Sequence, residues 1–148
     1  MNPTIVKFGW PATLVREFDH WVVLARPAQP TLGSLILAAK SDATAFGDLP
    51  GEAHAELKQA TQAIEAALAK AVNYARINYL MLMMVDPHVH FHVIPRYEGA
   101  REWPKGEKSA REFVDVGWPK VPDLAHAVEL AAAERADLVE WLKDSFGS

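Results

Sequence analysis

Three histidines stand at alternate positions in one short segment of the chain. They are His88, His90 and His92, within the run HVHFHVI over residues 88–94. Strict alternation of histidine with apolar residues predicts a strand, in which alternate side chains share a face. Neighbouring imidazoles would lie about 7 Å apart and the outer two about 13 Å apart. We therefore expect a row of histidines on one face of a strand, with the apolar residues between them facing the core.

Such a row could carry out phosphoryl transfer. Imidazole titrates near neutral pH, so it can serve as a nucleophile, as a hydrogen-bond donor to phosphate oxygens, or as a proton source for a leaving group. A zinc site is a second interpretation, but zinc needs nitrogens at about 2.0–2.1 Å, which two of the histidines could supply and three on a straight strand could not. A solvated strand face is the third interpretation, although such faces usually carry Thr, Lys, Glu or Ser.

The run HVHFHVI matches the pattern His-φ-His-φ-His-φ-φ, where φ is apolar, that marks the histidine triad (HIT) family. The chain resembles this family over roughly residues 20–97, and Pro95-Arg96-Tyr97 also resembles the branch that includes the diadenosine polyphosphate hydrolases. The resemblance implies an α+β fold on a five-stranded antiparallel sheet, a homodimer, and cleavage of a nucleoside phosphate or dinucleotide at the α-phosphorus. It implies no cofactor and no metal.

The resemblance also implies a role for each histidine. His90 would be the nucleophile that forms a covalent nucleotidyl-histidine, and water would then release the nucleotide. His88 and His92 would orient His90 and donate hydrogen bonds to the phosphate and the leaving group. Arg96, directly after the triad, is a candidate phosphate contact; a surface ion pair with Glu98 is the competing interpretation.

Three features depart from the family's pattern. Ser34 follows Gly33 where many relatives carry Gly-His, and it could contact phosphate through its hydroxyl or backbone without being a comparable proton shuttle. Arg26 stands where relatives often place Asp or Asn on the ribose; because arginine accepts no hydrogen bond, it would favour a phosphate or carboxylate. The Gly-Gln that often precedes the triad is absent. These departures keep a second hypothesis open, a nucleotide-binding or regulatory protein with little turnover.

The elements that must position the row can be outlined from the sequence pattern. We expect an antiparallel hairpin of strands over 20–26 and 34–39, a strand over 79–85 that is buried on both faces, and the triad strand ending at Pro95. An apolar stripe of 3.6-residue period predicts a helix from Glu52 to about Asn73. A second helix is expected from Leu124 to Phe146, and an irregular segment over 96–121. The prediction is an α+β fold in which an antiparallel sheet packs against a long helix and a C-terminal helix, with residues 1–148 as a single domain.

Composition narrows the class of protein. The chain has 148 residues, a net charge of -4 and no cysteine. The lack of cysteine excludes a disulfide framework, a thiolate zinc site and a cysteine nucleophile. The acidic balance argues against binding to a nucleic-acid backbone. No signal peptide or membrane span is expected, because no basic start with an apolar run and no stretch of about 18 apolar residues is present. We expect a cytoplasmic protein.

Overall fold

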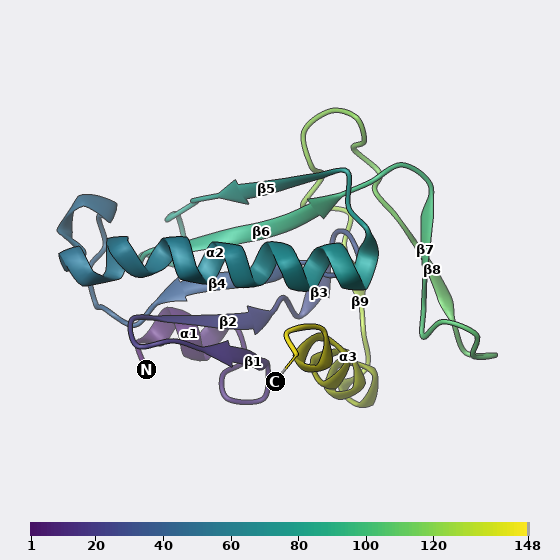
Figure 1. Cartoon of the computed structure of the whole chain (residues 1–148), viewed down its shortest axis with the longest axis horizontal. Helices are drawn as coiled ribbons and strands as arrows, with labels where there is room; N and C mark the ends of the chain where they lie inside the picture. The colour runs from purple at the N-terminus through teal and green to yellow at the C-terminus, as the bar shows by residue number, and fades with distance from the viewer. Residues whose placement is uncertain (148) are drawn as a thin grey trace.

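The computed structural model describes residues 1–147 as a layered α+β fold (Figure 1). Five antiparallel strands form the main sheet in the order β1-β2-β4-β6-β5. These strands are β1 (Leu14–Glu17), β2 (Trp21–Ala25), β4 (Leu35–Ala39), β5 (Arg76–Leu80) and β6 (His90–Arg96). Helices α2 (Gly51–Val72) and α3 (Ala132–Ser145) cover one face of the sheet, and the short helix α1 (Pro3–Lys7) lies on the other. The expected fold class is confirmed.

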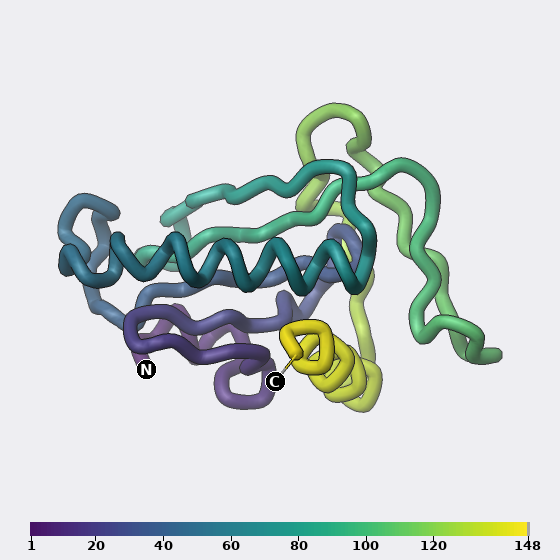
Figure 2. The backbone as a smooth tube through the Cα atoms, viewed as in Figure 1, coloured from purple at the N-terminus to yellow at the C-terminus, as the bar shows by residue number. Residues whose placement is uncertain are grey.

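Smaller elements decorate this sheet. β3 (Ala28–Gln29) pairs with β9 (Val128–Glu129), and β7 (Ala100–Trp103) pairs with β8 (Arg111–Val114). A 3-10 turn, η1 (Phe46–Asp48), precedes α2. The β7–β8 hairpin projects away from the rest of the molecule (Figure 2). The sequence predicts an irregular segment here, because its apolar anchors are too widely spaced to reveal two short strands.

The larger core fills the space between the sheet and the helices α2 and α3. Leu37 and Val93 from the sheet and Ile64 and Leu68 from α2 have no exposed surface. Trp21 joins them, and its indole N–H donates to the carbonyl of Ala53 at 2.8 Å, so the one polar atom of this side chain is satisfied. The predicted helix over 52–73 is confirmed within a residue at each end.

The N-terminal segment covers part of the opposite face of the sheet. Asn2 caps α1 by accepting from the backbone N–H of Ile5, and its side-chain amide donates to the carbonyls of Ala39 and Ser41. Ile5 is fully buried against the apolar side chains of β2 and β4 on this face. The sequence analysis placed no element here, although Asn before Pro at a helix start is a capping signal.

The apolar run over 79–85 does not form the predicted strand. β5 covers residues 76–80, and its last paired residue, Leu80, lies opposite His92. The chain then leaves the sheet, so Leu82 is 43% exposed and Met84 and Val85 are each 82% exposed. The pairing thus ends two residues before β6 itself does, since β6 extends to His90.

Two predicted boundaries also need correction. The triad strand continues through Pro95 to Arg96, because the Pro95 carbonyl still accepts from the Thr31 hydroxyl at 2.7 Å and the Arg96 carbonyl from the Ala75 N–H. The last helix starts at Ala132 and not at Leu124, because residues 128–129 are used as strand β9.

Among residues 1–147, no helix is long and apolar enough to cross a membrane.

Candidate active site

His90 lies at the first position of β6, and its ring is held by a backbone group. Its Nδ1 is 2.8 Å from the carbonyl oxygen of His88. A carbonyl can only accept, so Nδ1 carries the proton and a neutral His90 has its lone pair on Nε2. That Nε2 is buried and has no hydrogen-bond partner among the described residues. The geometry therefore presents an unprotonated, unpaired nitrogen on the face of the sheet that α1 covers.

His88 precedes the strand and does not extend the row as the sequence predicts. Its Nδ1 is 2.8 Å from the hydroxyl of Thr4 in α1, and its backbone N–H also points to that hydroxyl, at 3.4 Å. Its backbone carbonyl is the group that fixes the His90 ring. His88 thus contacts His90 through its backbone carbonyl, while its imidazole bonds to Thr4 of α1.

His92 lies beside His90, with the ring centroids 5.2 Å apart. The Nε of Arg26 donates to its Nδ1 at 3.4 Å, so the ring proton of a neutral His92 belongs on Nε2. Burial, followed by electrostatic interaction with Arg26 and then with His90, lowers the pKa of His92 to about 4. His92 is therefore neutral at pH 7 and can act there as a hydrogen-bond donor rather than as a strong acid.

Phe8, just after α1, closes this face over the histidines. Its ring centroid lies 5.4 Å from that of His90 and 5.9 Å from that of His92. His90 has no exposed surface and His92 only 8%. The segment is also tied down by an ion pair of 2.7 Å between Lys7 and Asp86. The described conformation is thus a covered one, which the sequence analysis did not foresee.

Of the three further residues predicted to bind substrate, only Arg26 lies beside the triad. Its Nη1 donates to the carbonyl of Ala28 at 2.6 Å, which orients the guanidinium toward His92. Ser34 is fully buried in the turn before β4. Its hydroxyl donates to the carbonyl of Thr31 at 2.7 Å, and its N–H bonds to Thr31 and Gln29. Because these bonds use its donors, Ser34 serves the turn instead of a phosphate.

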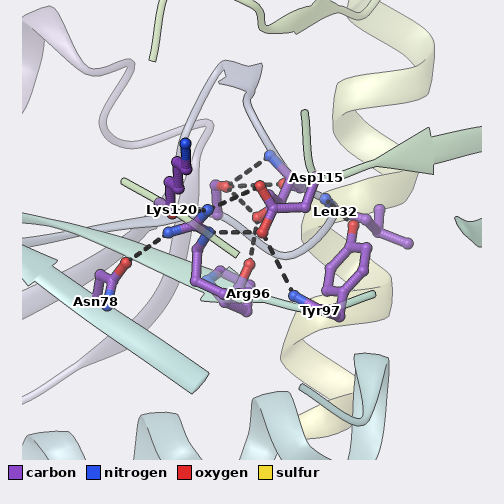
Figure 3. A network of polar contacts seen from close by, with 9 residues as sticks. Leu32, Asn78, Arg96, Tyr97, Asp115 and Lys120 are labelled. Carbon is purple, nitrogen blue, oxygen red and sulfur yellow. Dashed lines mark hydrogen bonds and ion pairs between the residues drawn. The ribbon is translucent and has the colours of Figure 1, made fainter. Parts of the chain in front are cut away.

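Arg96 takes part in a buried network of hydrogen bonds (Figure 3). Its Nε and Nη2 donate to the two carboxylate oxygens of Asp115 at 2.6 and 3.0 Å, its Nη1 donates to Asn78 Oδ1, and its Nη2 also reaches the carbonyl of Lys120. Only 3% of Arg96 is exposed. The predicted surface pair with Glu98 is wrong, because the carboxylate that Arg96 meets is Asp115, nineteen residues along the chain.

The zinc interpretation does not fit the described residues. No group of three or more His, Asp or Glu side chains within residues 1–147 is arranged to hold a metal ion. The Nδ1 atoms of the three triad histidines are bonded to the Thr4 hydroxyl, the His88 carbonyl and Arg26. The other three histidines lie elsewhere: the His20 backbone N–H donates to Glu56, His54 packs on Phe46, and His126 is paired with Asp123 at the surface.

Comparison with known proteins decides the family. The sequence model of the HIT domain matches residues 8–99. The chain belongs to the HIT family. A histidine triad protein from Sinorhizobium meliloti 1021 shares the fold with a TM-score of 0.72 at 20% identity, over 98% of this chain and 95% of that one. One from Bradyrhizobium japonicum gives 0.66 at 18% identity, over 99% and 96%.

A hypothetical histidine triad nucleotide-binding protein from Sulfolobus tokodaii strain 7 matches this HIT protein with a TM-score of 0.66 at 16% identity, over 97% of this chain and 89% of that one. None of the curated proteins matches the chain. Identities this low show a shared fold. HIT membership supports nucleotide binding, or hydrolase or transferase activity, in general. The narrower resemblance to the diadenosine polyphosphate hydrolases stays a prediction.

Proposed function

We propose that this HIT protein is a nucleotidyl hydrolase or transferase that attacks the α-phosphorus of a nucleoside phosphate with His90. The observation that carries the proposal is the unpaired Nε2 of His90, with its lone pair fixed there by the bond from Nδ1 to the His88 carbonyl. A buried polar atom without a partner is uncommon and costs stability, so it calls for a functional explanation. A phosphorus electrophile is a partner suited to that lone pair.

The proposed reaction has two steps. The His90 Nε2 lone pair forms a bond to the α-phosphorus, and the bond from phosphorus to the leaving group breaks, its electron pair leaving with that group. The resulting imidazolium keeps its Nδ1 proton, which still donates a hydrogen bond to the His88 carbonyl. This bond stabilises the positive charge. Water, or another acceptor, then attacks phosphorus, the N–P bond returns its electrons to Nε2, and the acceptor's proton passes to solvent.

The neighbouring groups would support the charge that develops on phosphate. The Nε2–H of His92 is available as a donor because Arg26 bonds to Nδ1. Arg26 itself brings a positive charge to the same place, where relatives often carry Asp or Asn. Phosphate oxygens are well matched to both groups. Arg26 is in this way assigned to phosphate rather than to a ribose hydroxyl.

Turnover by this route requires Phe8 to move. A nucleotide cannot reach a nitrogen that has no exposed surface while an aromatic ring lies over it. Trp10 lies on the same side of the sheet, and its Nε1 is also buried without a partner. The cover thus contains one unpaired donor, Trp10 Nε1, and lies over one unpaired acceptor, His90 Nε2, which suggests that it opens over a polar ligand.

Product release tests the proposal directly. Purified protein is incubated with adenosine phosphoramidate, diadenosine polyphosphates and nucleotide sugars, and mononucleotide is measured by chromatography. We expect release by the wild type and a loss of at least about a thousandfold, on the scale of removing a nucleophile, in His90→Ala. His126→Ala, at an exposed histidine far from the triad, is the matched control. Full activity of His90→Ala would contradict the assignment.

The cover itself favours a second candidate function, a nucleotide-binding or regulatory protein with little turnover. In that case Phe8 would open for binding while the departures at Arg26 and Ser34 prevent efficient chemistry. Calorimetry with adenosine monophosphate tests it. Binding that Phe8→Ala strengthens, with no product from any compound in the panel, would favour this candidate over the enzyme.

We also propose, from the family resemblance, that two copies associate as a homodimer, which sedimentation equilibrium measures.

A further inference from the structure

A cavity of about 400 Å³ lies between the β7–β8 hairpin and helix α3, and none of its lining residues belongs to the triad. The hairpin contributes one wall and α3 contributes the other. The lining residues are Trp103, Pro104, Glu107, Ser109, Asp137 and Trp141. A volume of this size lies within the range of pockets that hold small molecules. The chemistry of the cavity therefore depends mainly on two indole rings and two carboxylates.

The aromatic part of the cavity comes from two elements that are far apart in sequence. Trp103 ends β7 and Trp141 lies in α3, with their ring centroids 6.0 Å apart and their planes tilted by 49°. Trp141 is only half-buried and lines the cavity, so part of its ring is open to a ligand there. An indole ring attracts cations more strongly than the other aromatic side chains do. A positively charged group on Trp141 is thus favoured over a neutral group of the same shape.

Trp103 has a hydrogen-bond donor without a partner in residues 1–147. Only 5% of this residue is exposed, and its indole N–H forms no hydrogen bond within the described part of the chain. A buried tryptophan usually has a partner for this group, as Trp21 has in the carbonyl of Ala53. The Trp103 nitrogen is not fully buried, so a ligand can reach it. An oxygen acceptor on a molecule in the cavity would supply the missing partner.

The cavity is negatively charged. Glu107 and Asp137 line it, whereas no Lys or Arg does so. Within residues 1–147, neither carboxylate forms an ion pair or a hydrogen bond. Arg111 lies opposite Trp103 in the hairpin, but its guanidinium is bonded to Glu134 at 2.9 Å. Two carboxylates without a counter-charge, close to an indole ring, favour an organic cation over an anion or a neutral ligand.

Both walls are held in place by the protein itself. At the tip of the hairpin, the Glu107 N–H donates to the Pro104 carbonyl at 3.2 Å. The carboxylate of Glu134 in α3 accepts from Arg111 in β8 and, at 3.1 Å, from the Ala131 N–H at the start of α3. The ion pair therefore joins the hairpin to the helix. A preformed cavity lowers the ordering cost of binding a ligand.

We propose that this cavity binds a small organic cation, an ammonium group that carries a hydroxyl or another oxygen acceptor. The ammonium group lies on Trp141 near the carboxylates of Glu107 and Asp137, and the oxygen accepts from the Trp103 N–H. The site is separate from His90, so its occupation does not depend on the proposed reaction. Failure of either proposal leaves the other standing.

Three related compounds test the proposal. An NMR titration that follows the indole N–H resonances measures the affinity for choline and for tetramethylammonium, which lacks the hydroxyl. The third compound is the uncharged isostere of choline, in which a tert-butyl group replaces the trimethylammonium group. We expect choline to bind at least about tenfold more tightly than the isostere and about threefold more tightly than tetramethylammonium. No binding of choline, or equal affinity for choline and its isostere, would overturn the proposal.

Variants then locate the binding. Glu107→Gln/Asp137→Asn, at two exposed residues, should weaken choline binding at least about fivefold without affecting the fold. The matched control Asp42→Asn/Glu98→Gln removes equal charge from exposed positions outside the cavity and should change the affinity less than about twofold. Trp103→Phe keeps an aromatic ring and removes the donor, so choline should then bind no more tightly than tetramethylammonium. Equal losses in the two charge variants, or an advantage of choline that survives in Trp103→Phe, would overturn the assignment.

Discussion

At the level of single residues, one backbone carbonyl decides which nitrogen of His90 can react. The His88 carbonyl accepts from Nδ1, so the lone pair of the neutral ring is on Nε2. The alternation of the sequence indicates that His90 and His92 share a face, and the structure agrees. It could not indicate the tautomer, because that depends on a carbonyl whose direction follows from the bend of the chain before β6. Nor could it indicate Phe8, which is eighty-two residues away along the chain.

The cover over His90 gives a prediction at this scale. Removing the ring in Phe8→Ala should expose Nε2 and speed its modification by diethyl pyrocarbonate by about tenfold or more, measured by mass spectrometry of the peptide that contains His90. Phe18→Ala is the control, because Phe18 is a partly buried phenylalanine that packs away from the triad. An unchanged rate at His90 would show that Phe8 does not limit access.

The shifted pKa of His92 gives a second residue-scale prediction. Its pKa is about 4 in the folded chain against an ordinary value of 6.5. Between these values the unfolded chain binds the extra proton, so stability is full above pH 6.5 and falls as the pH drops toward 4. The shift corresponds to a loss of up to about 3 kcal/mol. Between pH 7.5 and pH 5.0, urea unfolding should show a smaller loss in the free energy of unfolding for His92→Gln than for the wild type. Equal losses in the two proteins would contradict the lowered pKa of His92.

At the level of elements, β6 and its two neighbours organise the site. β4 and β5 fix the register that sets His92 beside Ile36 on one side and Leu80 on the other. The sequence predicts α2 and the triad strand because their apolar patterns have one clear period. It misplaces the strand over 79–85 because an apolar run carries no register, and exposed methionines resemble buried ones in sequence.

The buried pair between β6 and the loop after β8 should be essential for stability. In Asp115→Asn the guanidinium of Arg96 loses its counter-charge while staying buried, and breaking such a pair costs about 3–5 kcal/mol. Glu17→Gln removes the exposed partner of Lys40 and should cost less than about 1 kcal/mol. Urea unfolding curves at pH 7 measure both. Similar small losses in the two variants would mean that the Arg96 network does not hold this loop.

At the level of the whole molecule, the two faces of the sheet have different roles: one packs against the core and the other carries the triad. The helices α2 and α3 bury most of the core on one face, and the opposite face carries His90, His92 and the N-terminal cover. This division explains why substitutions at the triad should leave the fold intact. The sequence predicts the α+β class and the triad, but not that residues 2–13 return to cover it, because the contacts involved are few and far apart in sequence.

Trapping of the covalent intermediate tests whether His90 is the nucleophile. Wild-type protein is mixed with a substrate that releases product, quenched within the first turnover, and examined by intact-mass and peptide mass spectrometry. We expect one nucleoside monophosphate attached per chain, located on His90 and absent from His90→Ala. Product formation with no adduct at early times, or an adduct on another residue, would contradict His90 as the nucleophile.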